Sequence, residues 1–206
     1  MVITEVKKRR RMLSELFLDG ESAGRIATEI WMRSGYRVGD NLSETEAEEL
    51  FQESERYRAK EKALYLLEYR SHSKKELEEK VSRAVSRDAA QEAVSHMEEL
   101  GLMDDERYAR DRAAYLVVRK GYAAKRAVYE LLQKGIDREL AETVVEELAP
   151  DPCEAIRELI EKKYPLAVSE EVHQRRAVAA LERLGYRYGD IRSVLSLLQE
   201  EAPTDF

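Results

Sequence analysis

Apolar residues recur at helical spacing from about residue 44 to the end of the chain. The pattern predicts helices over residues 44–70, 74–84, 88–100, 105–119, 123–134, 138–148, 153–163, 170–184 and 189–199. Ser43 and Ser73 each precede a glutamate by three residues, which is the capping-box arrangement that starts a helix. Glycines typical of helix C-terminal caps follow four of these segments: Gly101, Gly121, Gly135 and Gly185. A mainly helical fold is therefore expected.

The first 27 residues follow a different pattern. Apolar-rich runs cover residues 2–6, 12–18 and 22–26, and Asp19-Gly20 separates the last two. An Asp-Gly pair between such runs is a strong signal for a tight hairpin. We therefore predict a small N-terminal β-hairpin element and a short helix within residues 1–42.

The helical part of the chain repeats itself at an interval of 50 residues. Lys-Arg-Ala-Val at 125–128 recurs as Arg-Arg-Ala-Val at 175–178, and Lys75 precedes Lys125 by the same interval. This interval predicts three tandem three-helix repeats, over residues 43–101, 102–149 and 150–206. Such repeats bury their apolar faces against their neighbours, so an elongated, curved body is expected.

Composition supports this helical interpretation and disfavours a membrane or disulfide-bonded protein. Charged residues make up 37% of the chain, while only nine glycines and four prolines occur, which disfavours a barrel or sandwich. The longest uncharged stretch of the central region, residues 113–118, is far shorter than the roughly 20 residues that cross a bilayer. The single cysteine, Cys153, excludes an intrachain disulfide. We expect a monomer in the cytoplasm without membrane contact.

Motifs of common enzymes and cofactor sites are missing from the sequence. It contains no His-Glu-x-x-His, no paired cysteines and no glycine-rich phosphate loop. A catalytic group of Cys153 with a histidine and a carboxylate is conceivable, but a lone cysteine near a helix start is more often structural. We therefore expect no enzyme activity, no metal and no cofactor.

Basic residues concentrate in one segment of an acidic chain. The net charge is -7, yet residues 107–126 contain seven basic residues and one acid, a local net of +6. This basic stripe consists of Arg107, Arg110, Arg112, Arg119, Lys120, Lys125 and Arg126. Its charge predicts a localised contact with a polyanion.

The helix expected over residues 105–119 carries two stripes at a step of 100° per residue. The first is apolar and is expected in the core: Ala109, Ala113 and Leu116. The second alternates tyrosine and arginine: Tyr108, Arg112, Tyr115 and Arg119. Arginine binds phosphates and tyrosine stacks on bases, so the second stripe suits a nucleic acid. The alternative is a boundary where arginine stacks on tyrosine and fixes neighbouring helices.

Basic residues also recur in the first turn of each repeat's second helix, where the helix dipole disfavours them. These residues are Lys75, Lys125 and Arg175, with Arg176 beside the last. A shared binding role and simple common ancestry both explain this recurrence. Five consecutive basic residues at positions 7–11 present a similar choice between phosphate contact and a solvated strand connection.

Three motifs carry a resemblance to a known family. They are Ala63-Leu64-x-Leu66-Leu67-x-x-Arg70-x-x-Ser73-x-x-Glu76-Leu77, then Leu100-Gly101-Leu102-Met103-Asp104-Asp105-x-x-Tyr108-Ala109, then Lys120-Gly121 followed by Leu131-Leu132-x-Lys134-Gly135-Ile136. Their order and spacing resemble the RecX family, regulators of the bacterial RecA recombinase filament. They cover residues 60–148, and the hairpin and third repeat extend the likeness over nearly the whole chain.

The resemblance implies a modular, non-enzymatic protein of three-helix repeats. It implies that the repeats lie along the groove of the RecA–DNA filament and inhibit recombinase activity in DNA repair, recombination and the SOS response. Candidate contacts are then the basic stripe with Tyr115, together with Lys75, Arg175 and Arg176. The family commonly has arginine where this chain has His72, which makes that charge dependent on pH.

The acidity of the chain predicts docking mainly on recombinase protein, with weak DNA affinity alone. Two other functions are consistent with the residues. One is a helical-repeat adaptor for a protein unrelated to recombination. The other is an independent DNA-binding regulator, which requires duplex affinity and a steep salt dependence.

Overall fold

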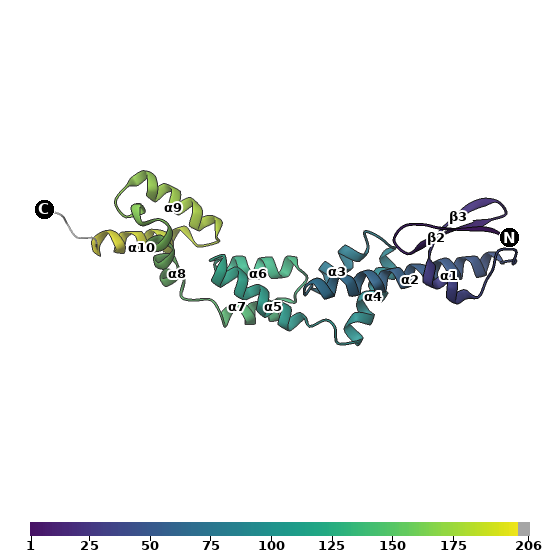
Figure 1. Ribbon diagram of the computed structural model, residues 1–206. Helices are drawn as coiled ribbons and strands as arrows, with labels where there is room; N and C mark the ends of the chain where they lie inside the picture. The colour runs from purple at the N-terminus through teal and green to yellow at the C-terminus, as the bar shows by residue number, and fades with distance from the viewer. Residues whose placement is uncertain (202–206) are drawn as a thin grey trace. The chain divides into compact units, whose positions relative to one another are not determined.

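The computed structural model describes residues 1–201. The chain divides after Asp104 into two compact units, residues 1–104 and residues 105–206 (Figure 1). Helices dominate both units, and the strands found within the described residues all belong to the first. The predicted mainly helical fold with a small N-terminal β-element is confirmed. None of the described helices is long and apolar enough to span a bilayer.

Three antiparallel strands form a sheet at the start of the first unit, in the order β1-β2-β3. β1 spans Ile3–Lys8, β2 spans Leu13–Leu18 and β3 spans Glu21–Ala27. Asp19 and Gly20 connect β2 to β3 with φ angles of 51° and 87°, the positive values that Asp-Gly hairpins use. The predicted hairpin is confirmed, and β1 adds a third strand beside β2.

Two helices cover the sheet. They are the short α1 (Thr28–Ser34) and the N-terminal half of the long α2 (Glu44–Tyr69). Ser43 caps α2 as expected, because its hydroxyl accepts from the Glu46 N–H while the Glu46 carboxylate accepts from the Ser43 N–H. Sheet and helices share one apolar cluster of Ile3, Leu16, Leu18, Ile26, Ala27, Ile30, Leu42, Ala47 and Leu50.

The C-terminal half of α2 packs with α3 (Lys74–Val81) and α4 (Arg87–Glu99). Their cluster contains many small side chains: Ala59, Ala63, Leu77, Val81, Ala89, Ala90, Ala93, Val94 and Met97. α3 ends three residues before the predicted end. There the Ser82 hydroxyl donates to the carbonyl oxygen of Glu78 at 2.6 Å and satisfies a terminal acceptor.

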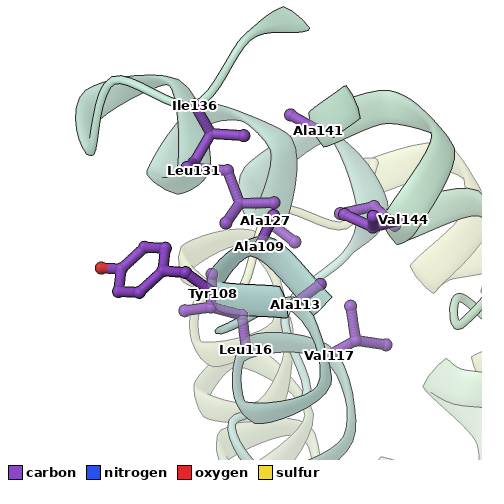
Figure 2. Close-up of a cluster of buried hydrophobic side chains, with 11 residues drawn as sticks. Tyr108, Ala109, Ala113, Leu116, Val117, Ala127, Leu131, Ile136, Ala141 and Val144 are labelled. Atoms are coloured by element: carbon purple, nitrogen blue, oxygen red, sulfur yellow. The ribbon is translucent and has the colours of Figure 1, made fainter. Parts of the chain in front are cut away.

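The second unit begins with α5 (Asp105–Ala114), which continues as the π-helical turn η1 (Tyr115–Arg119). α6 (Ala124–Gln133) and α7 (Arg138–Glu146) follow. Figure 2 shows the core where side chains of these helices meet. The three positions expected there are confirmed as buried: Ala109, Ala113 and Leu116.

The remaining helices of this unit are α8 (Pro152–Lys163), α9 (Glu171–Arg183) and α10 (Tyr188–Glu201), with a 3-10 turn, η2 (Pro165–Ala167), before α9. Their core contains Ala155, Ile156, Ile160, Ala167, Ala177, Leu181, Tyr186, Ile191, Val194, Leu195 and Leu198.

The two helix groups of the second unit contact each other near the start of α6. The Ala123 N–H donates to the Leu184 carbonyl oxygen at 2.9 Å. Gly185 has a φ of 98°, and a Cβ there would lie 2.7 Å from the Cβ of Arg126. Glycine is therefore required at position 185 by both its backbone and its neighbour.

The principal difference from the predicted elements is at residues 105–119, expected as one regular helix. The Lys120 N–H donates to the Tyr115 carbonyl oxygen at 3.0 Å, five residues back, instead of four. The predicted repeat boundaries and curvature stay predictions, and the end of the third repeat, residues 202–206, lies outside the described residues.

Candidate nucleic-acid interface

The residues of the basic stripe occupy α5, η1, the following turn and the start of α6. Arg110 is neutralised within the protein, since its guanidinium group lies 3.1 Å from Glu106 Oε1 and 2.5 Å from Glu147 Oε2. The hydrogen bonds that Arg110 donates to these two carboxylates raise its pKa above its ordinary value. Arg110 thus ties α5 to the end of α7 and adds little free positive charge to the surface.

Arg126 is also engaged inside its own unit. Its Cζ atom lies 4.4 Å from the centre of the Tyr122 ring, and Nη2 lies 3.9 Å from Glu130 Oε1. The Cβ of Arg126 is the atom that a Cβ at Gly185 would strike. This arginine therefore supports the junction between the two helix groups as well as the surface charge.

Three exposed cations dominate the rest of the stripe: Arg119, Lys120 and Lys125. Within residues 1–201, none of them has a carboxylate at ion-pair distance. Lys125 lies in the first turn of α6, where Ala123 supplies no side-chain cap to the helix amides. The positive end of the helix dipole therefore adds to the charge of Lys125.

Two cations lie close to the ring of Tyr115. Its side chain is 40% exposed, with Arg112 Cζ at 5.3 Å and Lys120 Nζ at 5.6 Å from the ring centre. The π-helical turn explains the second contact, because its five-residue hydrogen bond brings Lys120 back to the side of the helix that carries Tyr115. These contacts hold the ring in place beside positive charge.

The predicted stripe of alternating tyrosine and arginine needs two corrections. Tyr108 is only 6% exposed and belongs to the core, because α5 packs against both α6 and α7 and its buried arc is wider than three positions. Beyond Ala114 the step of 100° no longer applies. Lys120, rather than Arg119, is the second cation beside the Tyr115 ring, in addition to Arg112.

The other candidate residues lie on separate elements. Lys75 is exposed in the first turn of α3, in the first unit, and Arg107 is exposed in α5. Arg175 forms an ion pair with Glu171 and lines a hollow of about 320 Å³ with residues of α10, while Arg176 is exposed beside it. That hollow includes no residue of the basic stripe.

An apolar groove of about 640 Å³ lies beside Lys125. It runs between α6, α7 and the connection to α8, and its lining includes Val128, Tyr129, Leu132 and Val145. Tyr129 is 59% exposed there. The basic surface around Lys125 therefore borders an apolar one.

The basic residues at positions 7–11 lie at the end of β1 and in its connection to β2. Lys7 pairs with Glu5 at 2.8 Å, and Arg9 pairs with Glu15 at 2.5 Å. The Arg9 hydrogen bond holds the pKa of the Glu15 carboxyl below its ordinary value. Both ion pairs match the structural interpretation of this run.

His72 is buried at the start of α3. Its Nδ1 lies 2.8 Å from the Arg70 carbonyl oxygen and its Nε2 lies 2.9 Å from Lys80 Nζ. A carbonyl can only accept and an ammonium can only donate, so the ring is neutral with its proton on Nδ1. Burial, followed by the charges of Arg70 and Lys80, lowers the pKa of His72 despite the Arg70 hydrogen bond.

Among the described residues, no group of three or more His, Cys, Asp or Glu side chains could hold a metal ion. Cys153 is exposed in the first turn of α8, where its N–H donates to Asp151. The geometry therefore offers a charged and partly aromatic surface as the candidate site. Sequence periodicity missed the Lys120–Tyr115 contact, because no residue pattern announces the π-helical turn.

Sequence comparison connects the chain to proteins of known name. Residues 104–145 match the family model described as "RecX, second three-helix domain". The regulatory protein RecX of Caldanaerobacter subterraneus subsp. tengcongensis is 31% identical over 170 residues, covering 79% of this chain and 84% of that protein. The regulatory protein RecX of Xanthomonas axonopodis pv. citri is 34% identical over 139 residues, covering 65% and 83%.

Two crystal structures share the fold. One, of a regulatory protein RecX, has a TM-score of 0.61 at 16% identity and covers 97% of this chain and 98% of its own. The other, RecX from Lactobacillus salivarius, has a TM-score of 0.56 at 24% identity and covers 71% and 97%. The fold agrees with these structures, and the sequence relationship to the Caldanaerobacter protein extends over most of both chains. The chain therefore belongs to the RecX family of regulatory proteins.

Proposed function

We propose that this protein is a non-enzymatic regulator that binds the RecA–DNA filament and inhibits recombinase activity in DNA repair and recombination. Membership of a family of regulatory proteins supports the regulatory role. The observation that carries the contact is the set of exposed cations near Tyr115, namely Arg119, Lys120 and Lys125, which have no ion-pair partner within residues 1–201, in a chain of net charge -7. The protein acts as a monomer in the cytoplasm, where the filament forms.

The basic stripe has two kinds of residue in this proposal. Arg119, Lys120 and Lys125 bind phosphates, because each is exposed and has no competing carboxylate among the described residues. Tyr115 offers a ring that Arg112 and Lys120 already hold in place, so little side-chain entropy is lost on contact. Arg110 and Arg126 position the helices through their own partners.

The remaining candidates extend the contact over both units. Arg107 lies on the same helix as the centre of the stripe, and Lys75, Arg175 and Arg176 repeat its charge in the other helix groups. Each three-helix repeat then presents at least one cation to the filament. The acidic remainder of the chain restricts DNA contact to local groups of cations and favours docking on recombinase protein elsewhere.

The decisive experiment measures ATP hydrolysis by RecA on single-stranded DNA while the protein is titrated in, with filament length followed by microscopy. The test variant combines Arg119→Ala, Lys120→Ala and Lys125→Ala. The matched control combines Arg138→Ala, Lys162→Ala and Lys163→Ala, which removes the same charge from exposed positions outside the stripe. Far-UV circular dichroism establishes that both variants remain folded.

We expect the wild-type protein and the control to suppress hydrolysis and shorten filaments. The test variant should need at least about tenfold more protein for the same effect, because three phosphate contacts are lost. Equal activity of test and control variants contradicts the assigned contact. No effect of folded wild-type protein at saturation contradicts recombinase regulation and favours a protein-binding adaptor, whereas duplex binding without any recombinase effect favours an independent DNA-binding regulator.

A further inference from the structure

A second pairing of a cation with an exposed tyrosine occurs on α2, in the first unit. Lys62 Nζ lies 5.1 Å from the centre of the Tyr65 ring, and Tyr65 is 64% exposed. In the second unit, Arg112 lies 5.3 Å from the ring of Tyr115. The two cations are 50 positions apart in the sequence, and so are the two tyrosines. This interval is the one that relates the repeats.

Buried residues show that positions 50 apart in these two helices have the same relation to their cores. Four alanines related by 50 positions are fully buried: Ala59 and Ala63 in α2, and Ala109 and Ala113 in α5. Because the buried faces of α2 and α5 correspond, so do the positions on their exposed faces. Tyr115 already belongs to η1, but Leu116 and Val117 behind it pack on their core as Leu66 and Leu67 do behind Tyr65. The Lys62–Tyr65 pair therefore has a similar place relative to its own core as the Arg112–Tyr115 pair.

The charge around the pair in the first unit favours an anionic ligand. Residues 58–75 contain six basic and two acidic residues, and residues 108–125 contain five and one. Lys60, Arg70 and Lys74 pair with glutamates outside the first segment, as Arg110 does in the second, so the charge available to a ligand comes from the other cations. Among the described residues, Lys62 has no carboxylate at ion-pair distance. Lys75 is exposed ten residues beyond Tyr65, as Lys125 is beyond Tyr115. Charge and ring exposure recur together.

We propose that Lys62 and Tyr65 form a second contact for unpaired DNA, in which Tyr65 stacks on a base and Lys62 binds a neighbouring phosphate. Single strands expose the base faces that an aromatic ring needs, whereas a duplex covers them. This inference deepens the proposed function and rests on it for the identity of the polyanion. Each unit then contributes one aromatic contact, and Pro165 replaces the tyrosine at the next interval.

Two contacts on one chain make binding bivalent. Once one unit is bound to a strand, the other unit encounters the same strand at a high effective concentration. Loss of either tyrosine should therefore weaken binding to single strands strongly without abolishing it. Loss of Tyr65 should change the affinity for duplex DNA little, because the bases of a duplex are covered and only Lys62 then contacts the DNA, through a phosphate.

Photocrosslinking tests the stacking contact directly. The full-length protein is irradiated with a single-stranded oligothymidylate that contains 5-iodouracil, alone and after assembly of RecA on the same strand. Mass spectrometry then identifies the attached residue. We expect adducts at Tyr65 and Tyr115, and none at Tyr69. Tyr69 is on the same helix as Tyr65 and 85% exposed, but none of the described residues places a cation over its ring.

Affinity measurements on the same oligonucleotide separate the ring from the charge. Tyr65→Ala should weaken binding about 5- to 100-fold, while Tyr65→Phe should retain it, because stacking needs only the ring. Lys62→Ala should reduce the salt dependence of binding by about one phosphate contact. Tyr69→Ala serves as the matched control and should change affinity less than about twofold.

The proposal is overturned if Tyr65 gives no adduct and Tyr65→Ala binds like Tyr69→Ala, or if Tyr65→Ala weakens duplex and single-strand binding equally. RecA ATP hydrolysis, measured in parallel, separates this failure from failure of the proposed function. If inhibition of RecA persists but Tyr65 makes no contact, the proposed regulatory function stands and the stacking site is wrong. If Tyr65 forms an adduct but RecA is unaffected, the stacking site stands and the proposed regulatory function is wrong.

Discussion

At the scale of single residues, the buried site of His72 predicts that the stability of the first unit depends on pH. The ring is 3% exposed and neutral, with Lys80 Nζ donating to Nε2 and with Arg70 and Glu76 also near it. Protonation would place a third positive charge beside Arg70 and Lys80, in a buried site where only Glu76 opposes it.

This environment predicts acid destabilisation in a defined window. Because the folded pKa of His72 is below its ordinary value of 6.5, the unfolded chain takes up the proton first as pH falls. The contribution of neutral His72 to the free energy of unfolding is fully present above about pH 6.5. It is lost progressively as the pH falls from there to the pKa of His72 in the folded protein. Urea unfolding followed by the fluorescence of Trp31, the single tryptophan and a residue of the first unit, measures the effect.

A substitution isolates the histidine in this measurement. His72→Gln should flatten the dependence of the unfolding midpoint between about pH 7 and pH 5, since glutamine does not titrate. His96→Gln is the control, because His96 is partly exposed and its nearest carboxylate, on Glu99, lies at 3.7 Å. A slope that survives in His72→Gln assigns the pH dependence to another group.

At the scale of elements, the π-helical turn η1 determines which cation lies over Tyr115. A π-helical turn contains one residue more than an α-helical turn. Deleting the exposed Val118 should therefore convert η1 to a regular helix, keep Lys120 beside Tyr115 and preserve stability. Deleting Leu64 from the regular helix α2 should instead rotate the following residues by about 100° and expose Leu66 and Leu67.

Thermal unfolding and amide hydrogen exchange measure both deletions. We expect a melting temperature for the Val118 deletion equal to or above that of the parent, and a clear decrease for the Leu64 deletion. A similar loss in both deletions shows that the π-helical turn is required for the fold of the second unit.

Helix starts and turns could be predicted from the sequence, whereas contacts between helices could not. Ser43, Ser73 and the Asp19-Gly20 pair gave reliable starts and turns, because their side chains or φ preferences act on their immediate neighbours. The burial of Tyr108 and the partners of Arg110 depend on helices that are distant in sequence. Periodicity within one helix cannot reveal them. The repeat interval was predictive for core positions, and it also connects Lys62–Tyr65 to Arg112–Tyr115.

At the scale of the whole molecule, a net charge of -7 predicts that the proposed DNA contact is local. The three exposed cations of the stripe, at about 0.7 counterions each on single strands, predict a slope of at least about -2 for log affinity against log salt. Fluorescence anisotropy without recombinase at increasing salt measures this slope. In the triple alanine variant, the slope of log affinity against log salt should become shallower by about two. A slope near zero in the wild-type protein contradicts phosphate contact.

Helix α2 has a mechanical consequence for the first unit. Its 26 residues contribute Ala47 and Leu50 to the cluster under the sheet, and Ala59 and Ala63 to the cluster with α3 and α4. The Ser54 hydroxyl, near the middle, accepts from the Ala27 N–H at 2.7 Å. The helix is continuous from Glu44 to Tyr69 and about 39 Å long. We therefore expect a force applied to the sheet to be transmitted to α3 and α4, because an unbroken helix and not a flexible linker joins the two clusters.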